Sequence, residues 1–160
     1  MIFLKKILVT TDLSPHSLAA VEYALSFGTL YTSRLYLLLV MEKREGVNTR
    51  EAHVHFRSEE EATRALEEFA HNNLPHDIHM NLVVRKGTPI EGILRFAKEE
   101  GIDMIVMATH GHTGLRHILM GNVTEKVVRQ SRIPVLTVKP RPFRESDIQD
   151  EDVEKDLHLR

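Results

Sequence analysis

Short apolar runs alternate with helix-forming segments along nearly the whole chain, and this alternation constrains the fold more than any other feature. Five runs have the length and composition of buried strands, at residues 2–9, 35–40, 78–84, 104–107 and 135–138. The four segments between them carry apolar residues at helical spacing. Apolar strands that alternate with helices predict a parallel sheet covered by helices on both faces. We therefore expect an α/β fold, a three-layer sandwich with a five-stranded parallel sheet.

Capping residues mark several of the expected helix ends. Ser14 precedes a proline and predicts a helix start, with the serine as cap. Thr88 also precedes a proline, and Glu91 three residues later predicts a capping box. Gly101 is expected to end this second helix. Gly28, inside the first helix, marks a place where that helix weakens or packs closely.

Composition limits the classes of function that the chain can have. Its 160 residues suffice for one domain, and we expect that domain to occupy residues 1–140. Residues 141–160 hold four basic and seven acidic residues without a core pattern, which predicts a charged, solvated tail. The net charge of −2 argues against a nucleic-acid partner, and no apolar run is long enough to cross a membrane. The absence of cysteine and of a signal peptide favours a cytoplasmic location.

A glycine-bearing loop joins the fourth strand to the fourth helix. Gly111, Gly114 and Gly121 fall within eleven residues, and the last of them lies directly before a helical pattern. A helix N-terminus offers unpaired N–H groups and a positive dipole end, which together suit a phosphate. Glycines in such a loop can also serve tight turns alone. The spacing by itself leaves both interpretations open.

Three strand ends are expected to meet at one edge of the sheet. Asp12 follows the first strand, Val40 ends the second, and residues 108–111 follow the fourth. In open parallel sheets ligands bind beyond the carboxyl ends of the strands, where the strand order reverses. The sequence therefore predicts a binding site that combines these three segments.

Several motifs, taken in order, resemble the universal stress protein family. They are TTDLS after the first strand, LLLVME at the second, GTP before the third helix, MATHGHTG after the fourth strand, and MGNVTEKVVRQSRIPVLTVKP at the end. The likeness covers about residues 1–140. The nucleotide-binding branch of this family carries G-x2-G-x9-G-[S/T]. The corresponding positions here are Ala108, Gly111, Gly121 and Asn122, so the first glycine and the final hydroxyl residue are replaced.

This resemblance implies a flavodoxin-like or Rossmann-like sandwich of the adenine nucleotide alpha hydrolase-like type. It also implies a homodimer formed through the last strand, Val135–Val138, and binding of ATP, with Mg²⁺ as a possible companion. By the same resemblance Asp12 would meet the ribose and the backbone of Val40 the adenine. The residues expected to line the cleft are Thr10, Thr11, Met107, Ala108 and His110. Those expected to cradle the phosphates are Gly111, Gly121, Asn122, Val123 and Thr124.

Individual site residues have alternative roles. Asp12 can instead cap the following helix together with Ser14. Thr124 can offer its hydroxyl to a phosphate or face solvent in the first helical turn. Asn122 can donate its amide to phosphate or accept from the N–H of Glu125 as a helix cap. The methyl group of Ala108 narrows the space where backbone approaches a ligand.

The chemistry expected of the site is binding more than catalysis. His110, His112 and His117 can pair with anions when protonated, but nothing in their spacing sets the geometry of a metal site. The chain lacks a P-loop and a G-x-S-x-G nucleophile motif. We expect a stress protein with ATP as regulatory ligand. The alternatives are an interaction protein of the same fold without nucleotide, and a slow ATPase.

Overall fold

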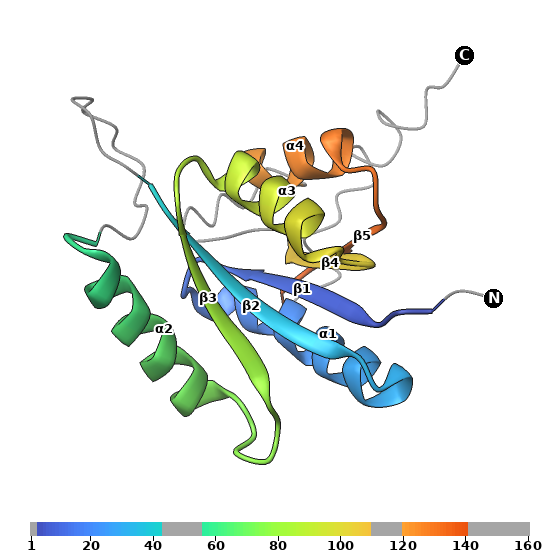
Figure 1. Ribbon diagram of the computed structural model, residues 1–160, viewed down its shortest axis with the longest axis horizontal. Coiled ribbons are helices and arrows are strands. Elements are labelled where there is room, and N and C mark those ends of the chain that lie inside the picture. Colours follow the sequence, from blue (N-terminus) through green and yellow to red (C-terminus); the bar gives the residue numbers. More distant parts are fainter. Residues whose placement is uncertain (1–2, 43–55, 110–119, 141–160) are drawn as a thin grey trace, which may run out of the picture.

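A computed structural model describes residues 3–42, 56–109 and 120–140. The five strands are β1 (Lys6–Thr11), β2 (Arg34–Met41), β3 (Met80–Lys86), β4 (Met104–Ala108) and β5 (Val135–Val138). They form one sheet in the order β3-β2-β1-β4-β5, and all neighbouring strands run parallel (Figure 1). The expected five-stranded parallel sheet is therefore confirmed. β1 begins at Lys6 and not near residue 2, because its ladder with β2 starts at the pair Lys6–Arg34.

The helices cover both faces of the sheet, as predicted for a three-layer sandwich. They are α1 (Leu18–Tyr31), preceded by the 3-10 turn η1 (Pro15–Ser17), α2 (Glu59–Asn73), α3 (Pro89–Glu100) and α4 (Asn122–Gln130). α1 and α2 pack on one face, and α3 and α4 on the other. No helix in the described part of the chain is long and apolar enough to cross a membrane.

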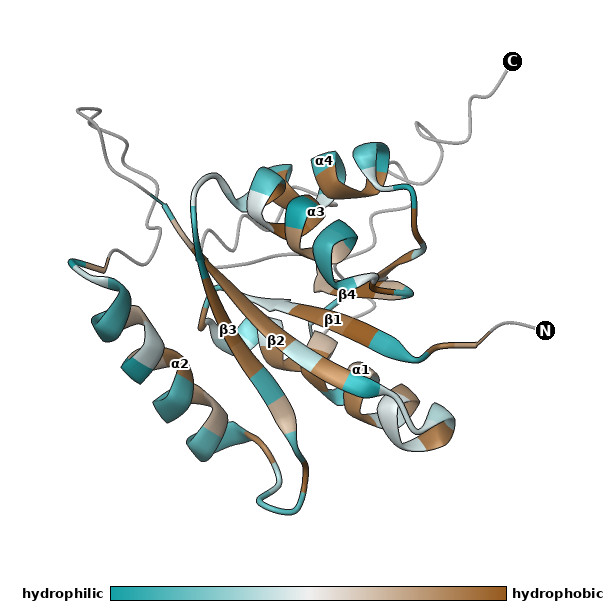
Figure 2. Ribbon diagram, in the orientation of Figure 1, coloured by the Kyte–Doolittle hydropathy of each residue, from teal (hydrophilic) through white to brown (hydrophobic). Residues whose placement is uncertain are grey.

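Alternate residues of each buried strand belong to two separate hydrophobic cores, one on each face of the sheet. Ile7 and Val9 of β1 face α1 and α2, whereas Leu8 between them faces α3 and α4. All three are fully buried. Figure 2 shows the result, with apolar colouring concentrated on the central strands. The near-continuous apolar runs in the sequence are explained by this burial on both faces.

The helix ends differ in part from the sequence-based expectation. Ser14 precedes η1 and not the α-helix itself, which begins at Leu18. The expected capping box at Thr88 is wrong, because that residue makes no side-chain cap hydrogen bond. Gly101 ends α3 in the left-handed conformation, at φ 62°, as predicted. Gly28 serves close packing, since a Cβ there would lie 2.8 Å from Leu35 of β2.

Asp103 links the starts of β1 and β4 through hydrogen bonds. Its Oδ2 accepts hydrogen bonds from the N–H groups of Lys5 and Lys6, both at 2.8 Å, and its own N–H donates to the Lys6 carbonyl at 2.9 Å.

We expect Asp103→Ala to lower the free energy of unfolding by about 2 kcal/mol, because two backbone donors lose a charged acceptor. Urea titration measures this. Asp103→Asn, which keeps an acceptor oxygen, is expected to lose less than half as much, and equal losses would contradict the account.

Candidate functional site

The buried polar side chains gather at one place in the molecule. Within residues 3–42, 56–109 and 120–140, five polar side chains are buried, namely Thr11, Ser14, Ser17, Thr109 and Thr124. They come from the end of β1 and the turn after it, the residue after β4, and the first turn of α4. β1 lies between β2 and β4, so the strand order reverses here. We call the carboxyl ends of β1 and β4, with these hydroxyl residues, the switch edge.

Hydroxyl groups hold the turn after β1 in a set conformation. Thr11 Oγ1 lies 2.8 Å from Ser17 Oγ and accepts from the Leu13 N–H at 2.9 Å. Ser17 Oγ donates in turn to the Ser14 carbonyl at 2.8 Å. Leu13 adopts φ 62°, a conformation that costs a non-glycine residue free energy. Such strain persists where the surroundings overdetermine the backbone, as this network does, and it is concentrated at functional sites.

Asp12 lies at the centre of this turn and is half-buried. Its Oδ1 accepts from the Ser14 N–H at 3.0 Å and from Ser14 Oγ at 2.5 Å. The alternative role is therefore present only in part, because Asp12 binds Ser14 but the Ser14 side chain makes no helix-cap hydrogen bond. This contact orients the carboxylate and is compatible with a ribose role, because an ionised carboxylate can accept about four hydrogen bonds.

The direction of the Val40 carbonyl follows from the alternation of the sheet. In β2 the N–H of even-numbered Arg34 donates toward β1, to the Lys5 carbonyl at 2.8 Å. The carbonyl of odd-numbered Met41 accepts from the β3 side, from Gly87 at 3.0 Å. Parallel strands direct successive residues to opposite neighbours. The carbonyl of Val40 therefore points toward the β1 side.

β1 ends too early to pair with that carbonyl in the usual way. The last register pair of the two strands is Thr11–Leu39, so Val40 lies one residue past it. A continued β1 would present the Leu13 N–H to Val40, but that group donates to Thr11 Oγ1 instead. The Val40 side chain packs against Gly92 of α3, since a Cβ on Gly92 would lie 2.9 Å from the Val40 methyl carbons. The end of β2 thus offers a backbone acceptor beside Asp12.

The N-terminus of α4 is joined directly to the end of β4. The Gly121 N–H donates to the Thr109 carbonyl at 2.7 Å, and Thr124 Oγ1 donates to the Ala108 carbonyl at 3.0 Å. A Cβ on Gly121 would lie 3.2 Å from the Thr109 oxygen, so the close approach favours glycine. These bonds aim the first turn of α4, with its N–H groups and dipole, at the switch edge.

Two details at this helix start correct the sequence-based alternatives. Gly121 is the N-cap and Asn122 is the first helical residue, so Asn122 does not cap the helix. Its side chain is exposed. Thr124 is buried and hydrogen-bonded to the sheet, so it does not face solvent. Its hydroxyl positions α4, and any phosphate role for Thr124 falls to its backbone N–H.

The remaining predicted site residues differ in their surroundings. Thr10 and Ala108 are half-buried near the ends of β1 and β4. Met107 is buried in the core beneath α3 and α4. Val123 is half-buried in the first turn of α4. His110 and Gly111, with the other loop histidines, lie outside the described residues. Sequence reasoning missed Ser17 and Thr109, although a serine two residues after Pro15 and a threonine directly after an apolar strand were visible signals.

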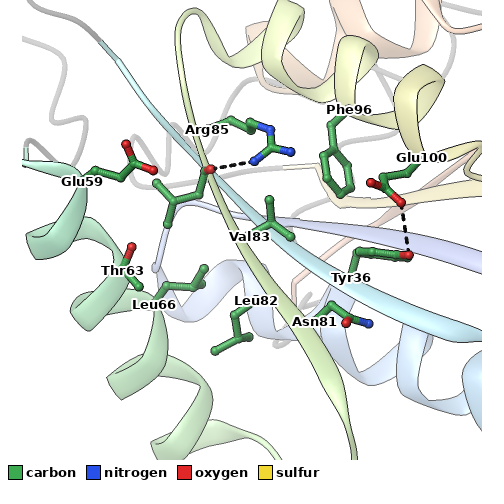
Figure 3. A pocket seen from close by; sticks show the side chains of 11 residues that line it. Tyr36, Glu59, Thr63, Leu66, Asn81, Leu82, Val83, Arg85, Phe96 and Glu100 are labelled. Atoms are coloured by element: carbon green, nitrogen blue, oxygen red, sulfur yellow. Dashed lines mark hydrogen bonds between the residues drawn. The ribbon is translucent and has the colours of Figure 1, made fainter.

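An open groove of about 420 Å³ lies elsewhere, around the edge strand β3. Figure 3 shows side chains from α2, β3 and α3 along it. The Arg85 guanidinium lies over the Phe96 ring at 5.2 Å, and the Tyr36 hydroxyl donates to Glu100 at 3.3 Å. These groups are engaged with each other, and none forms a nucleophile–base pair. The switch edge is the better candidate because buried polar groups and a helix N-terminus converge there.

Fold and candidate site together define a doubly wound α/β protein with buried polar side chains at its topological switch point. The model of the universal stress protein family matches residues 4–139. The chain belongs to this family, which confirms the resemblance found in its motifs.

Known relatives support the same assignment. Universal stress protein MJ0577 of Methanocaldococcus jannaschii is 33% identical over 153 residues, covering 84% of this chain and 94% of the relative. The solved structure of MJ0577 superposes with a TM-score of 0.70 at 30% identity, covering 89% of this chain and all of that one.

Two more distant solved structures of the family share the fold and hold adenine compounds. A universal stress protein in complex with cAMP superposes with a TM-score of 0.64 at 21% identity, covering 86% of this chain and 98% of that one. An Archaeoglobus fulgidus universal stress protein in complex with dAMP gives 0.62 at 17% identity, covering 87% and 100%.

Proposed function

We propose that this protein binds ATP or a related adenine nucleotide at the switch edge, as a regulatory ligand in a stress response. The observation that carries the proposal is the convergence there of three features. They are the oriented carboxylate of Asp12, the Val40 carbonyl directed past the end of β1, and the N-terminus of α4. These suit a ribose, an adenine amino group and a phosphate, respectively.

The compounds bound by the two more distant relatives support the choice of ligand class. cAMP and dAMP share an adenine, a sugar and one phosphate. A nucleotide with more phosphates would extend them beyond the N-terminus of α4, with Mg²⁺ bound by the phosphates. Because the described residues around the site offer binding groups and no activated nucleophile, occupancy of the site is the proposed signal.

Gly121→Val tests the phosphate half of the site. We expect wild-type protein to gain several degrees of thermal stability in millimolar ATP with Mg²⁺, since a ligand that binds only the native state stabilises it. The valine Cβ would lie 3.2 Å from the Thr109 carbonyl oxygen, closer than such atoms usually come, so we expect the branched side chain to shift the first turn of α4. The variant should lose most of the shift. Gln130→Val, exposed at the far end of α4, is the matched control and should keep it.

Two results would decide against the proposal. One is an unchanged melting temperature of the wild type with ATP, AMP and cAMP at millimolar concentration. The other is a thermal shift that Gly121→Val retains in full. Denaturing the purified protein and separating any released adenine nucleotide by chromatography gives an independent check. Phosphate release that persists through purification, and is lost in Gly121→Val, would favour the slow ATPase.

We propose further that the protein forms a homodimer through β5. β5 is an edge strand of four residues. The Ile105 N–H donates to the Pro134 carbonyl and the Thr109 N–H to the Val138 carbonyl, so even-numbered residues of β5 face β4. The N–H and C=O groups of Val135 and Thr137 therefore point to the open edge. No described strand pairs with this edge, and an edge of this kind is a template for pairing with a second copy.

A further inference from the structure

The outward flank of α1 is apolar to a degree unusual for a surface helix. Tyr23, Phe27, Leu30 and Tyr31 recur at helical spacing and form one stripe, called here the aromatic flank. Tyr23 is 45% exposed, Leu30 73% and Tyr31 46%. The rings of Phe27 and Tyr31 stack, with centroids 6.3 Å apart. Glu22 is the one charged residue among the fourteen of α1.

The other helix on the same face of the sheet behaves differently. α2 places three glutamates in its first turn and shows mainly polar colouring, whereas α1 is largely pale or apolar in colour (Figure 2). The polar residues of α1 are confined to one side. Ser26 and Thr29 bond back to the carbonyls of Glu22 and Leu25 at 3.0 Å. The aromatic flank is therefore a distinct surface and not part of a uniformly apolar helix.

The aromatic flank lies on the side of α1 that faces the β5 edge. Gly28, about a third of a turn around the helix from the flank, packs on Leu35 of β2. α1 also crosses β1 and β4 and reaches β5. In a right-handed β1-α1-β2 crossover the side of the helix turned away from β2 faces β4 and β5. No other described helix covers that part of this face.

We propose that the aromatic flank is a docking surface for the same surface of a second copy of this chain. Its exposed side chains amount to on the order of 300 Å², already a large apolar patch for a monomer. A stable dimer buries about 800 Å² per partner, so the flank needs an adjoining surface. The open edge of β5 adjoins it. The near absence of charge on α1 favours a self-complementary apolar contact over a charged partner.

The geometry of edge pairing brings the two flanks to the same side. Antiparallel pairing of β5 with its copy extends one sheet across a twofold axis perpendicular to it. Such an axis keeps each face of the sheet on the same side in both protomers. The two α1 helices then flank the axis on one face, with Tyr23, Leu30 and Tyr31 directed toward the partner. This inference uses the proposed β5 edge for its location, but it concerns a separate surface that can fail on its own.

Leu30→Glu tests the flank. We expect sedimentation equilibrium to show a wild-type dimer and at least a roughly tenfold higher dimer dissociation constant for the variant, because the contact would bury a carboxylate. Thr29→Glu, the neighbouring exposed residue on the polar side, is the matched control and should leave the constant unchanged. Since Leu30 is 73% exposed, both variants should keep the far-ultraviolet circular dichroism spectrum of the wild type at room temperature.

Thr137→Pro separates this surface from the β5 edge. It removes an N–H that points to the open edge while the ladder to β4 stays intact. Weaker dimers in both Leu30→Glu and Thr137→Pro support the flank and the edge together. A dimer weakened by Leu30→Glu alone supports the flank without the edge. A dimer weakened only by Thr137→Pro, or a wild type that is monomeric at all concentrations, overturns the inference.

Discussion

Asp12→Ala is expected to weaken the binding of adenine nucleotide roughly 10- to 100-fold. The variant removes the acceptor that, in the proposed complex, would bind a ribose hydroxyl pair, and hydrogen bonds to charged groups contribute about 1.5–3 kcal/mol. Isothermal titration calorimetry with ATP and with AMP measures the effect. The loss should be similar for both ligands, because the ribose is common to them.

Asp12→Asn distinguishes ligand contact from loop collapse. Its amide oxygen can still accept from the Ser14 N–H and Oγ, which now donate to Asp12 Oδ1 at 3.0 and 2.5 Å. The turn should therefore keep its stability, while affinity still falls because the negative charge and one acceptor are gone. Wild-type affinity in Asp12→Ala would rule out the ribose role. Full affinity in Asp12→Asn would assign the effect of alanine to the turn.

Phe96→Ala is expected to lower the free energy of unfolding by about 3 kcal/mol, at the lower end of the usual range for a buried phenylalanine. Among the residues that the structure describes, Phe96 is the largest fully buried side chain. Its ring meets Tyr36 edge-on at 5.6 Å and supports the guanidinium of Arg85. The groove beside β3 lets water and neighbouring side chains enter part of the vacated space, which limits the cost.

Urea unfolding checks this value through the midpoint, with the m-value unchanged. Phe3→Ala is the matched control, because Phe3 is 64% exposed and the same truncation there should change stability by less than about 0.5 kcal/mol. Comparable losses in the two variants would contradict the assignment of Phe96 as a core anchor. So would a change in Phe96→Ala of less than about 1 kcal/mol.

Much of the candidate site could be predicted because its parts lie at strand ends. Parallel strands deliver their carboxyl ends to one edge, which predicts that Asp12, Val40 and Ala108 lie near each other. The structure places all three at the switch edge. Thr124 was also expected there, but its hydroxyl binds the Ala108 carbonyl, a contact between residues 16 apart that local sequence does not specify.

Other features depended on where the chain stops pairing. The Val40 carbonyl reaches past β1 because β1 ends at Thr11, and β1 ends there because Leu13 turns into the left-handed region. Leucine has no intrinsic preference for that conformation, so propensity alone points the other way. The bonds from Thr11, Ser14 and Ser17 stabilise it. The exposure of the aromatic flank was likewise not predicted from the sequence, because an apolar helix is expected to be buried.

Sequence patterns alone predict the layered α/β architecture, the number and direction of the strands, and the edge at which the candidate site lies. These follow from local periodicity and from the rule that parallel strands need crossover helices. The tertiary structure alone decided the strand order, the bonding partners of each hydroxyl group and the side of α1 left uncovered. These depend on contacts between distant segments, whose energies are set by packing geometry and not by any one stretch of residues.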